Sequence, residues 1–128
     1  MEPSVGDGAF ISELAKEENI NINLTALDIN KAELNTASEK WSKKTASFIE
    51  TDFLEYTTTK QYSAVIGNPP YVKKNILTSK QIELSKEIHS NENLTEASVK
   101  NIWATFLVKS NTLLAKNGVL AFVLQAFI

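Results

Sequence analysis

The chain has 128 residues, of which 43% are hydrophobic and 22% charged, as in an ordinary globular domain or part of one. It has no cysteine, a single histidine and no apolar run near the ~20 residues that cross a bilayer. We therefore expect a cytoplasmic protein without a metal site or membrane association, and the net charge of −2 gives no overall sign of nucleic-acid binding.

The predicted elements alternate between helices and strands, which favours a mostly parallel α/β sheet flanked by helices. In chain order we expect a helix over 9–18, a strand over 23–29, a helix over 31–41 and strands over 45–50 and 62–66. Two helices then follow, over 78–89 and 95–116, and a strand over 119–124. We expect Asn117-Gly118 to stop the second of these helices, and the apolar last strand to be buried on both faces.

A Gly-rich turn over residues 2–10 runs into the first predicted helix. Gly6 and Gly8 have no Cβ, so the backbone can approach a ligand here. Asp28 lies twenty residues beyond Gly8, at the end of the next strand, where an acid can accept hydrogen bonds from both ribose hydroxyls. We include Ile29, which follows it, among the cofactor contacts. A dinucleotide site has a similar pattern, so this half alone does not fix the ligand.

Asp52 and Phe53 follow the next predicted strand. The carboxylate can accept from the exocyclic amine of an adenine, and the phenyl ring offers its face to the base. Because ligands bind at the carboxyl ends of parallel strands, these three strand ends predict one adenosine pocket.

Asn68-Pro69-Pro70-Tyr71 follows the strand over 62–66. The two prolines make this loop stiff, so the Asn amide oxygen and a proline carbonyl can accept both hydrogens of a planar amine. Tyr71 offers a stacking face for the ring that carries the amine. This arrangement is typical of methyl transfer to an amino group, in which positioning and electrostatics supply most of the catalysis.

These segments resemble the N6-adenine DNA methyltransferases of restriction–modification systems. The matching positions are Glu2, Pro3, Gly6, Gly8 and Phe10 in the turn, Asp28 at the ribose, Asp52-Phe53 at the adenine, and Asn68 through Tyr71 as the catalytic loop. The resemblance implies a Rossmann-like fold, S-adenosylmethionine as cofactor and double-stranded DNA as partner, with a restriction endonuclease as a fused domain or separate subunit. Gln125 departs from the proline usual in the family.

Only Met1 precedes the Gly-rich turn, whereas the family places a strand there. We therefore expect residues 1–128 to be a partial catalytic domain without its first strand, its closing strands and the target-recognition domain. Such a piece is expected to be inactive alone and to self-associate through exposed strand edges.

Three alternatives stay open at this point. A protein-glutamine methyltransferase also uses Asn-Pro-Pro-Tyr, an RNA adenine presents the same amine, and a truncated chain can bind cofactor or a partner without catalysis. The only local basic excess follows the catalytic loop, where Lys73 and Lys74 are candidate DNA contacts. We expect His89 at the surface and both Trp41 and Trp103 in the core.

Overall fold

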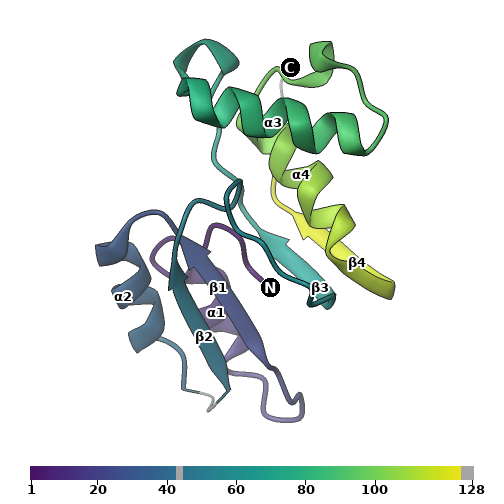
Figure 1. The fold of residues 1–128 in the computed structure, drawn as a ribbon. Helices are drawn as coiled ribbons and strands as arrows, with labels where there is room; N and C mark the ends of the chain where they lie inside the picture. Colours follow the sequence, from purple (N-terminus) through teal and green to yellow (C-terminus); the bar gives the residue numbers. More distant parts are fainter. Residues whose placement is uncertain (43–44, 125–128) are drawn as a thin grey trace.

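The computed structural model describes residues 1–42 and 45–124 (Figure 1). The elements are α1 Ala9–Leu14, β1 Leu24–Asp28, α2 Lys31–Glu39, β2 Ala46–Glu50, β3 Tyr62–Gly67, α3 Ser79–Asn91, α4 Ile102–Thr112 and β4 Leu114–Phe122. Two short 3-10 helices, η1 Lys74–Ile76 and η2 Glu96–Ser98, flank α3. In the described part of the chain, no helix has the length and apolar character needed to span a membrane.

All strand pairs are parallel, as the alternating pattern predicts. β1 pairs with β2, and β3 pairs with β4. Met1 and Glu2 lie between the two pairs: the Glu2 N–H donates to the Thr25 carbonyl at 2.9 Å, and the Ile66 N–H donates to the Met1 carbonyl at 2.9 Å. The order of hydrogen-bonded segments is therefore β2, β1, residues 1–2, β3 and β4, so β1 and β3 are bridged where we expected two open edges.

Two apolar clusters hold the layers together. One lies among α1, α2 and β1 and includes Ile11, Leu34 and Trp41, which confirms the core position of Trp41. The other joins β3 to α3, α4 and the segment after β2, and it is built around Val65, Phe53, Leu77, Ile102 and Phe106. The second cluster carries the residues that follow β2 and β3, where the site was expected.

The helix expected over 95–116 is shorter at both ends. It begins at Ile102, because the Asn101 side chain caps it by accepting from the Trp103 N–H at 3.2 Å. It ends at Thr112, since Leu114 already pairs with Tyr62 of β3. The expected stop at Asn117-Gly118 is wrong: Asn117, with φ of 63°, lies in an irregularity where the β3–β4 register shifts.

The expectation that the last strand is buried on both faces is also wrong. Side chains alternate along β4, so Leu120 and Phe122 pack against the second cluster while Val119 points away and is 59% exposed. Among the described residues β4 pairs with β3 alone. Gln125, the departure from the family pattern, lies outside the described residues.

His89 is buried, at 1% exposure, where a surface position was expected. Its Nδ1 lies 2.6 Å from Ser98 Oγ and its Nε2 lies 3.0 Å from Thr105 Oγ1, so it joins α3 to η2 and α4. Burial also lowers the pKa of His89, which favours the neutral ring in this position. The first helix, α1, ends at Leu14 and not at residue 18; Ile11 is its one buried residue, and Leu14 packs against the same cluster.

Candidate active site

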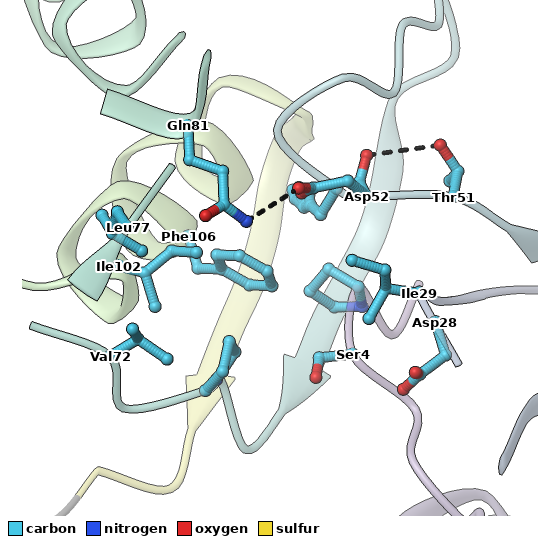
Figure 2. Close-up of a pocket in the computed structure, with 13 residues that line it drawn as sticks. Ser4, Asp28, Ile29, Thr51, Asp52, Val72, Leu77, Gln81, Ile102 and Phe106 are labelled. Atoms are coloured by element: carbon cyan, nitrogen blue, oxygen red, sulfur yellow. Dashed lines mark hydrogen bonds between the residues drawn. The ribbon is translucent and has the colours of Figure 1, made fainter. Parts of the chain in front are cut away.

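A cavity of about 200 Å³ opens where the carboxyl ends of β1, β2 and β3 meet (Figure 2). Its lining combines the predicted segments with residues from the later helices: Pro3, Ser4, Asp28, Ile29, Thr51, Asp52, Phe53, Pro70, Val72, Leu77, Gln81, Ile102 and Phe106. The turn before α1, both acid-bearing strand ends and the proline loop therefore line one space. Several residues expected at the site are not in this lining: Glu2, Gly6, Gly8, Phe10, Asn68, Pro69 and Tyr71. Phe10 is 36% exposed.

Asp28 holds the Gly-rich turn against the end of β1. Its Oδ2 accepts from the Gly6 N–H at 2.8 Å and its Oδ1 accepts from the Asn30 N–H at 2.8 Å. Asp28 as a residue is 8% exposed. Each oxygen keeps a further lone pair, so the group can still accept hydrogen bonds from a ligand in the cavity.

The two glycines of the turn have different roles. Both have positive φ, 56° at Gly6 and 89° at Gly8, which residues with a Cβ rarely adopt. A Cβ on Gly8 would lie 2.8 Å from Cα of Ala37, so Gly8 is needed for α1 to pack on α2. A Cβ on Gly6 would meet nothing within 4 Å, which leaves the backbone open there.

Glu2 is a buried carboxyl close to Gly67, the residue before the Asn-Pro-Pro-Tyr loop: a Cβ on Gly67 would lie 3.5 Å from Glu2 Cγ. It is 1% exposed, and its Oε2 has no hydrogen-bond partner among the described residues. Burial raises the pKa of Glu2 to about 8, with the Met1 amine opposing this shift and Asp28 adding to it. Burial in turn lowers the pKa of the Met1 amine to about 6. At neutral pH the Glu2 carboxyl is therefore mostly protonated. A cation bound beside it would favour the ionised form, which accepts hydrogen bonds.

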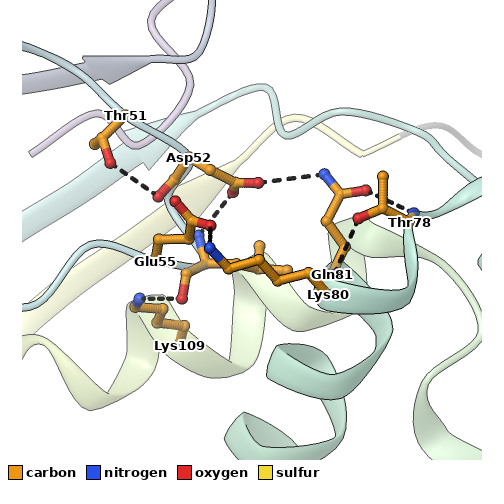
Figure 3. Close-up of polar contacts among 8 residues, drawn as sticks. Thr51, Asp52, Glu55, Thr78, Lys80, Gln81 and Lys109 are labelled. Carbon is orange, nitrogen blue, oxygen red and sulfur yellow. Dashed lines mark hydrogen bonds and ion pairs between the residues drawn. The ribbon is translucent and has the colours of Figure 1, made fainter.

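Asp52 is fixed from two sides at the end of β2. Its Oδ1 accepts from the Leu54 N–H at 2.9 Å, and its Oδ2 accepts from Gln81 Nε2 at 3.2 Å (Figure 3). Gln81 Oε1 accepts from the Thr78 N–H at 3.1 Å, so the amide can present only its NH₂ group to Asp52. Sequence reasoning missed Gln81, although Thr78-x-x-Gln81 is the signature of a capping box at the start of α3.

Lys109 of α4 orders the segment that follows Asp52. Its ammonium donates to the carbonyls of Phe53 at 2.5 Å, Leu54 at 3.1 Å and Tyr56 at 2.6 Å. Nζ also lies 5.0 Å from the Phe53 ring centroid, while Phe106 packs edge-on against that ring. Burial lowers the pKa of Lys109 to about 8, against the opposing charge of Asp52. No local sequence signal marks this residue, because its partners lie more than fifty positions away.

The Asn-Pro-Pro-Tyr loop leaves β3 with Asn68 exposed, Pro69 buried and Pro70 on the cavity wall. The Tyr71 hydroxyl donates to the Val123 carbonyl at 3.3 Å. The Val72 N–H donates to Asn101 Oδ1 at 3.1 Å, and the Val72 carbonyl accepts from the Ile102 N–H at 2.9 Å. The loop is therefore anchored to the start of α4, which fixes the direction in which it leaves the cavity.

The fold is that of class I S-adenosylmethionine-dependent methyltransferases. A Listeria monocytogenes structure described as such an enzyme superposes with a TM-score of 0.70 over 94% of this chain and 37% of its own, at 15% sequence identity.

The chain belongs to the Eco57I restriction-modification methylase family, whose sequence model matches residues 9–127. It is also 26% identical over 127 residues to the Type II methyltransferase M.AccI of Acinetobacter calcoaceticus, covering 98% of this chain. The match spans 23% of that relative's length.

S-adenosylmethionine is the cofactor that this family and fold imply, and the residues present fit it. The cavity is lined by an acid at the end of β1 and by an acid and a phenylalanine at the end of β2. The unpaired Oε2 of Glu2 is a buried acceptor suited to an ammonium group. The described residues hold no group of three or more His, Cys, Asp or Glu side chains that could bind a metal.

Proposed function

We propose that this chain is part of the catalytic domain of an enzyme that transfers a methyl group from S-adenosylmethionine to the N6 amine of adenine in DNA. The observation that carries the proposal is the shared cavity, which Pro70 of the Asn-Pro-Pro-Tyr loop lines together with Asp28 and Asp52. A donor and an acceptor of the methyl group can therefore meet in one place. The restriction-modification methylase family supports DNA as the substrate.

Five side chains would hold the cofactor. Asp28 would accept from the ribose hydroxyls, and Asp52 from the adenine amine once Gln81 releases or shares its oxygen. Ile29, which is 67% exposed at the cavity rim, and Phe53 offer apolar surface to the base. Glu2 would take the cofactor's ammonium, which would satisfy its unpaired oxygen. Bound S-adenosylmethionine supplies a methyl group on a sulfonium that is already a good leaving group.

The chain's own contribution to the reaction is to orient the acceptor amine. Asn68 Oδ1 and the Pro69 carbonyl would accept its two hydrogens, which places the nitrogen lone pair toward the methyl group. The amine nitrogen would accept the methyl group that the cofactor supplies and would release one proton to solvent. Tyr71 would stack on the target base, which must leave the duplex to reach the loop.

The partner of the complete enzyme in this proposal is double-stranded DNA in the cytoplasm of a bacterium. A restriction endonuclease, as a fused domain or a separate subunit, and a target-recognition domain would act with it. This chain covers 23% of the length of the M.AccI methyltransferase and 37% of the Listeria monocytogenes chain, so the remaining length of those proteins could hold such parts.

Calorimetry with S-adenosylhomocysteine tests the cofactor half. Asp28→Ala should weaken binding about 5- to 100-fold, because ~1–3 kcal/mol is lost when the ribose donors have no acceptor. Asp7→Ala, an exposed acid in the same turn, is the matched control and should bind normally. Equal affinity in the two variants would remove Asp28 from the site, and tighter binding of NAD would overturn the methyltransferase function.

Transfer of labelled methyl groups by the complete enzyme tests the catalytic half. Asn68→Ala should lose ~10²–10³ in rate while S-adenosylhomocysteine still binds, because removal of one preorganised acceptor acts on the amine. Asn35→Ala, on the exposed face of α2, is the control. Normal turnover in Asn68→Ala would make the loop structural. Methylation of RNA or of a glutamine peptide in preference to DNA would identify the other substrates.

A further inference from the structure

A second cavity, which we call the lysine groove, is lined in part by the residues that follow the Asn-Pro-Pro-Tyr loop. It has a volume of about 890 Å³ and is lined by Lys73, Lys74, Asn75, Ala97, Ser98, Val99, Lys100, Asn101, Trp103 and Ala104. These residues come from two segments separated in the sequence. The Lys74 N–H donates to the Lys100 carbonyl at 3.1 Å, so the two segments are joined at the floor of the groove.

The groove carries positive charge without local compensation. Its lining has three lysines and no acidic residue, although the whole chain has a net charge of −2. Ion pairs within residues 1–42 and 45–124 engage Lys16, Lys40, Lys80 and Lys86, and none of them involves a lysine of the groove. The three ammonium groups are therefore available to neutralise an external anion.

The groove begins where the catalytic loop ends. Lys73 follows Tyr71 by two residues, which limits their backbone separation to ~7 Å. Lys73 pairs with Asn101 in an antiparallel bridge, and Asn101 also accepts from the N–H groups of Val72 and Trp103. The loop and the groove thus share one hydrogen-bonded frame, so their relative position is fixed.

Trp103 adds an aromatic surface to this charge. It was expected in the core, yet it is only half-buried and lines the groove beside Lys100's segment. A groove that combines lysines with an accessible indole suits a polynucleotide strand. Phosphates neutralise the lysines there, and an unpaired base can stack on the ring. A free phosphate has no aromatic ring and so could not stack on the Trp103 indole.

We propose that the lysine groove binds the sugar-phosphate backbone of the DNA strand whose base enters the catalytic loop, with Trp103 stacking on an unpaired base of that strand. This proposal rests on the proposed function and adds Lys100 and Trp103 to the DNA contacts expected from the sequence. The stiff frame around Asn101 holds the strand at a set distance from Asn68, so that the flipped adenine is delivered to the loop.

The test is fluorescence anisotropy of the 128-residue chain with a labelled DNA oligonucleotide, single-stranded and as a duplex, between ~50 and ~200 mM NaCl. Each phosphate contact contributes about 0.7 to the slope of log affinity against log salt for a single strand. The triple variant Lys73→Ala, Lys74→Ala, Lys100→Ala should therefore lose about 2 from that slope. Trp103→Ala should lower single-strand affinity about 5- to 100-fold with an unchanged slope.

The matched controls are Lys31→Ala on the exposed face of α2, which should leave both quantities unchanged, and Trp41→Phe, which leaves Trp103 as the single indole. In Trp41→Phe, single-stranded DNA should quench the remaining fluorescence. Absence of DNA binding, equal effects of the triple variant and Lys31→Ala, or displacement by inorganic phosphate at matched ionic strength would each overturn the proposal. Tighter binding of RNA of the same sequence would overturn it as well.

S-adenosylhomocysteine binding separates this proposal from the one on which it rests. The groove residues are absent from the lining of the cofactor cavity, so the triple variant should bind S-adenosylhomocysteine as the parent chain does. If the triple variant has the smaller slope of log affinity against log salt and still binds S-adenosylhomocysteine, the groove is supported. Intact DNA binding in the triple variant contradicts the groove and leaves the cofactor result untouched.

Discussion

Two acids, Glu2 in the Gly-rich turn and Asp28 at the end of β1, lie close in the fold and have different environments. Asp28 is held by hydrogen bonds from the N–H groups of Gly6 and Asn30. Glu2 is buried with Oε2 unpaired among the described residues, and burial raises its pKa to about 8. One acid is thus ready to accept hydrogen bonds from a neutral hydroxyl, and the other gains most from a cation.

The stability of the chain should depend on pH through Glu2. Because its folded pKa of about 8 exceeds the ordinary 4.5, its contribution is fully present below pH 4.5 and is lost as pH rises toward 8. Glu2→Gln mimics the protonated side chain and removes this dependence. Urea unfolding of both proteins from pH 5 to 8 should show the parent losing on the order of 3 kcal/mol relative to Glu2→Gln. Parallel stability curves would contradict the prediction.

Among the elements, the sequence predicted those whose signals are local. Alternation of strands and helices, the turn at Gly6 and Gly8 and the strand-end acids indicated the parallel sheet and the shared cavity. The signals that failed depend on tertiary contacts. The polar residues around His89 predict an exposed helix end. In the fold, however, Ser98 and Thr105 supply hydrogen-bond partners for both ring nitrogens in the core. The Asn117-Gly118 pair predicts a helix C-terminus, but the chain already pairs with β3 at Leu114.

Lys109 connects α4 to the segment that carries Asp52 and Phe53, so it should act on both stability and cofactor binding. Lys109→Met keeps the apolar stem and removes the donor shared by three carbonyls. We expect the free energy of unfolding to fall by ~1–3 kcal/mol, because those carbonyls lose their partner. S-adenosylhomocysteine affinity should fall as well, since the segment is less ordered.

Lys116→Met, at an exposed position of β4, is the control for the Lys109 variant. It should change neither the unfolding free energy nor the affinity measured by calorimetry. A Lys109→Met protein with normal stability would mean that water replaces the ammonium without cost. Lost stability with normal affinity would confine the role of Lys109 to folding.

At the scale of the whole molecule, the sheet is covered unevenly. Leu120 and Phe122 of β4 pack against the cluster shared with α4, while Val119, Ala121 and Val123 alternate onto the opposite side. Val119 is 59% exposed and Val123 is 55% exposed. The Val123 N–H donates to the Gly67 carbonyl at 2.9 Å and the Val123 carbonyl accepts from the Tyr71 hydroxyl at 3.3 Å, so one end of this apolar surface adjoins the Asn-Pro-Pro-Tyr loop.

The 128-residue chain should therefore self-associate through β4 and should not methylate duplex DNA by itself. Val119 and Val123 present apolar side chains to water, and an unpaired strand edge accepts another strand. Val119→Lys places a charge on this surface and should shift sedimentation toward the monomer, whereas Ile76→Lys, at a 71% exposed position in η1, should not. A parent chain that sediments as a monomer at every concentration, or that transfers labelled methyl groups to adenine in duplex DNA, would contradict this prediction. Association that persists unchanged in Val119→Lys would place the contact on another surface.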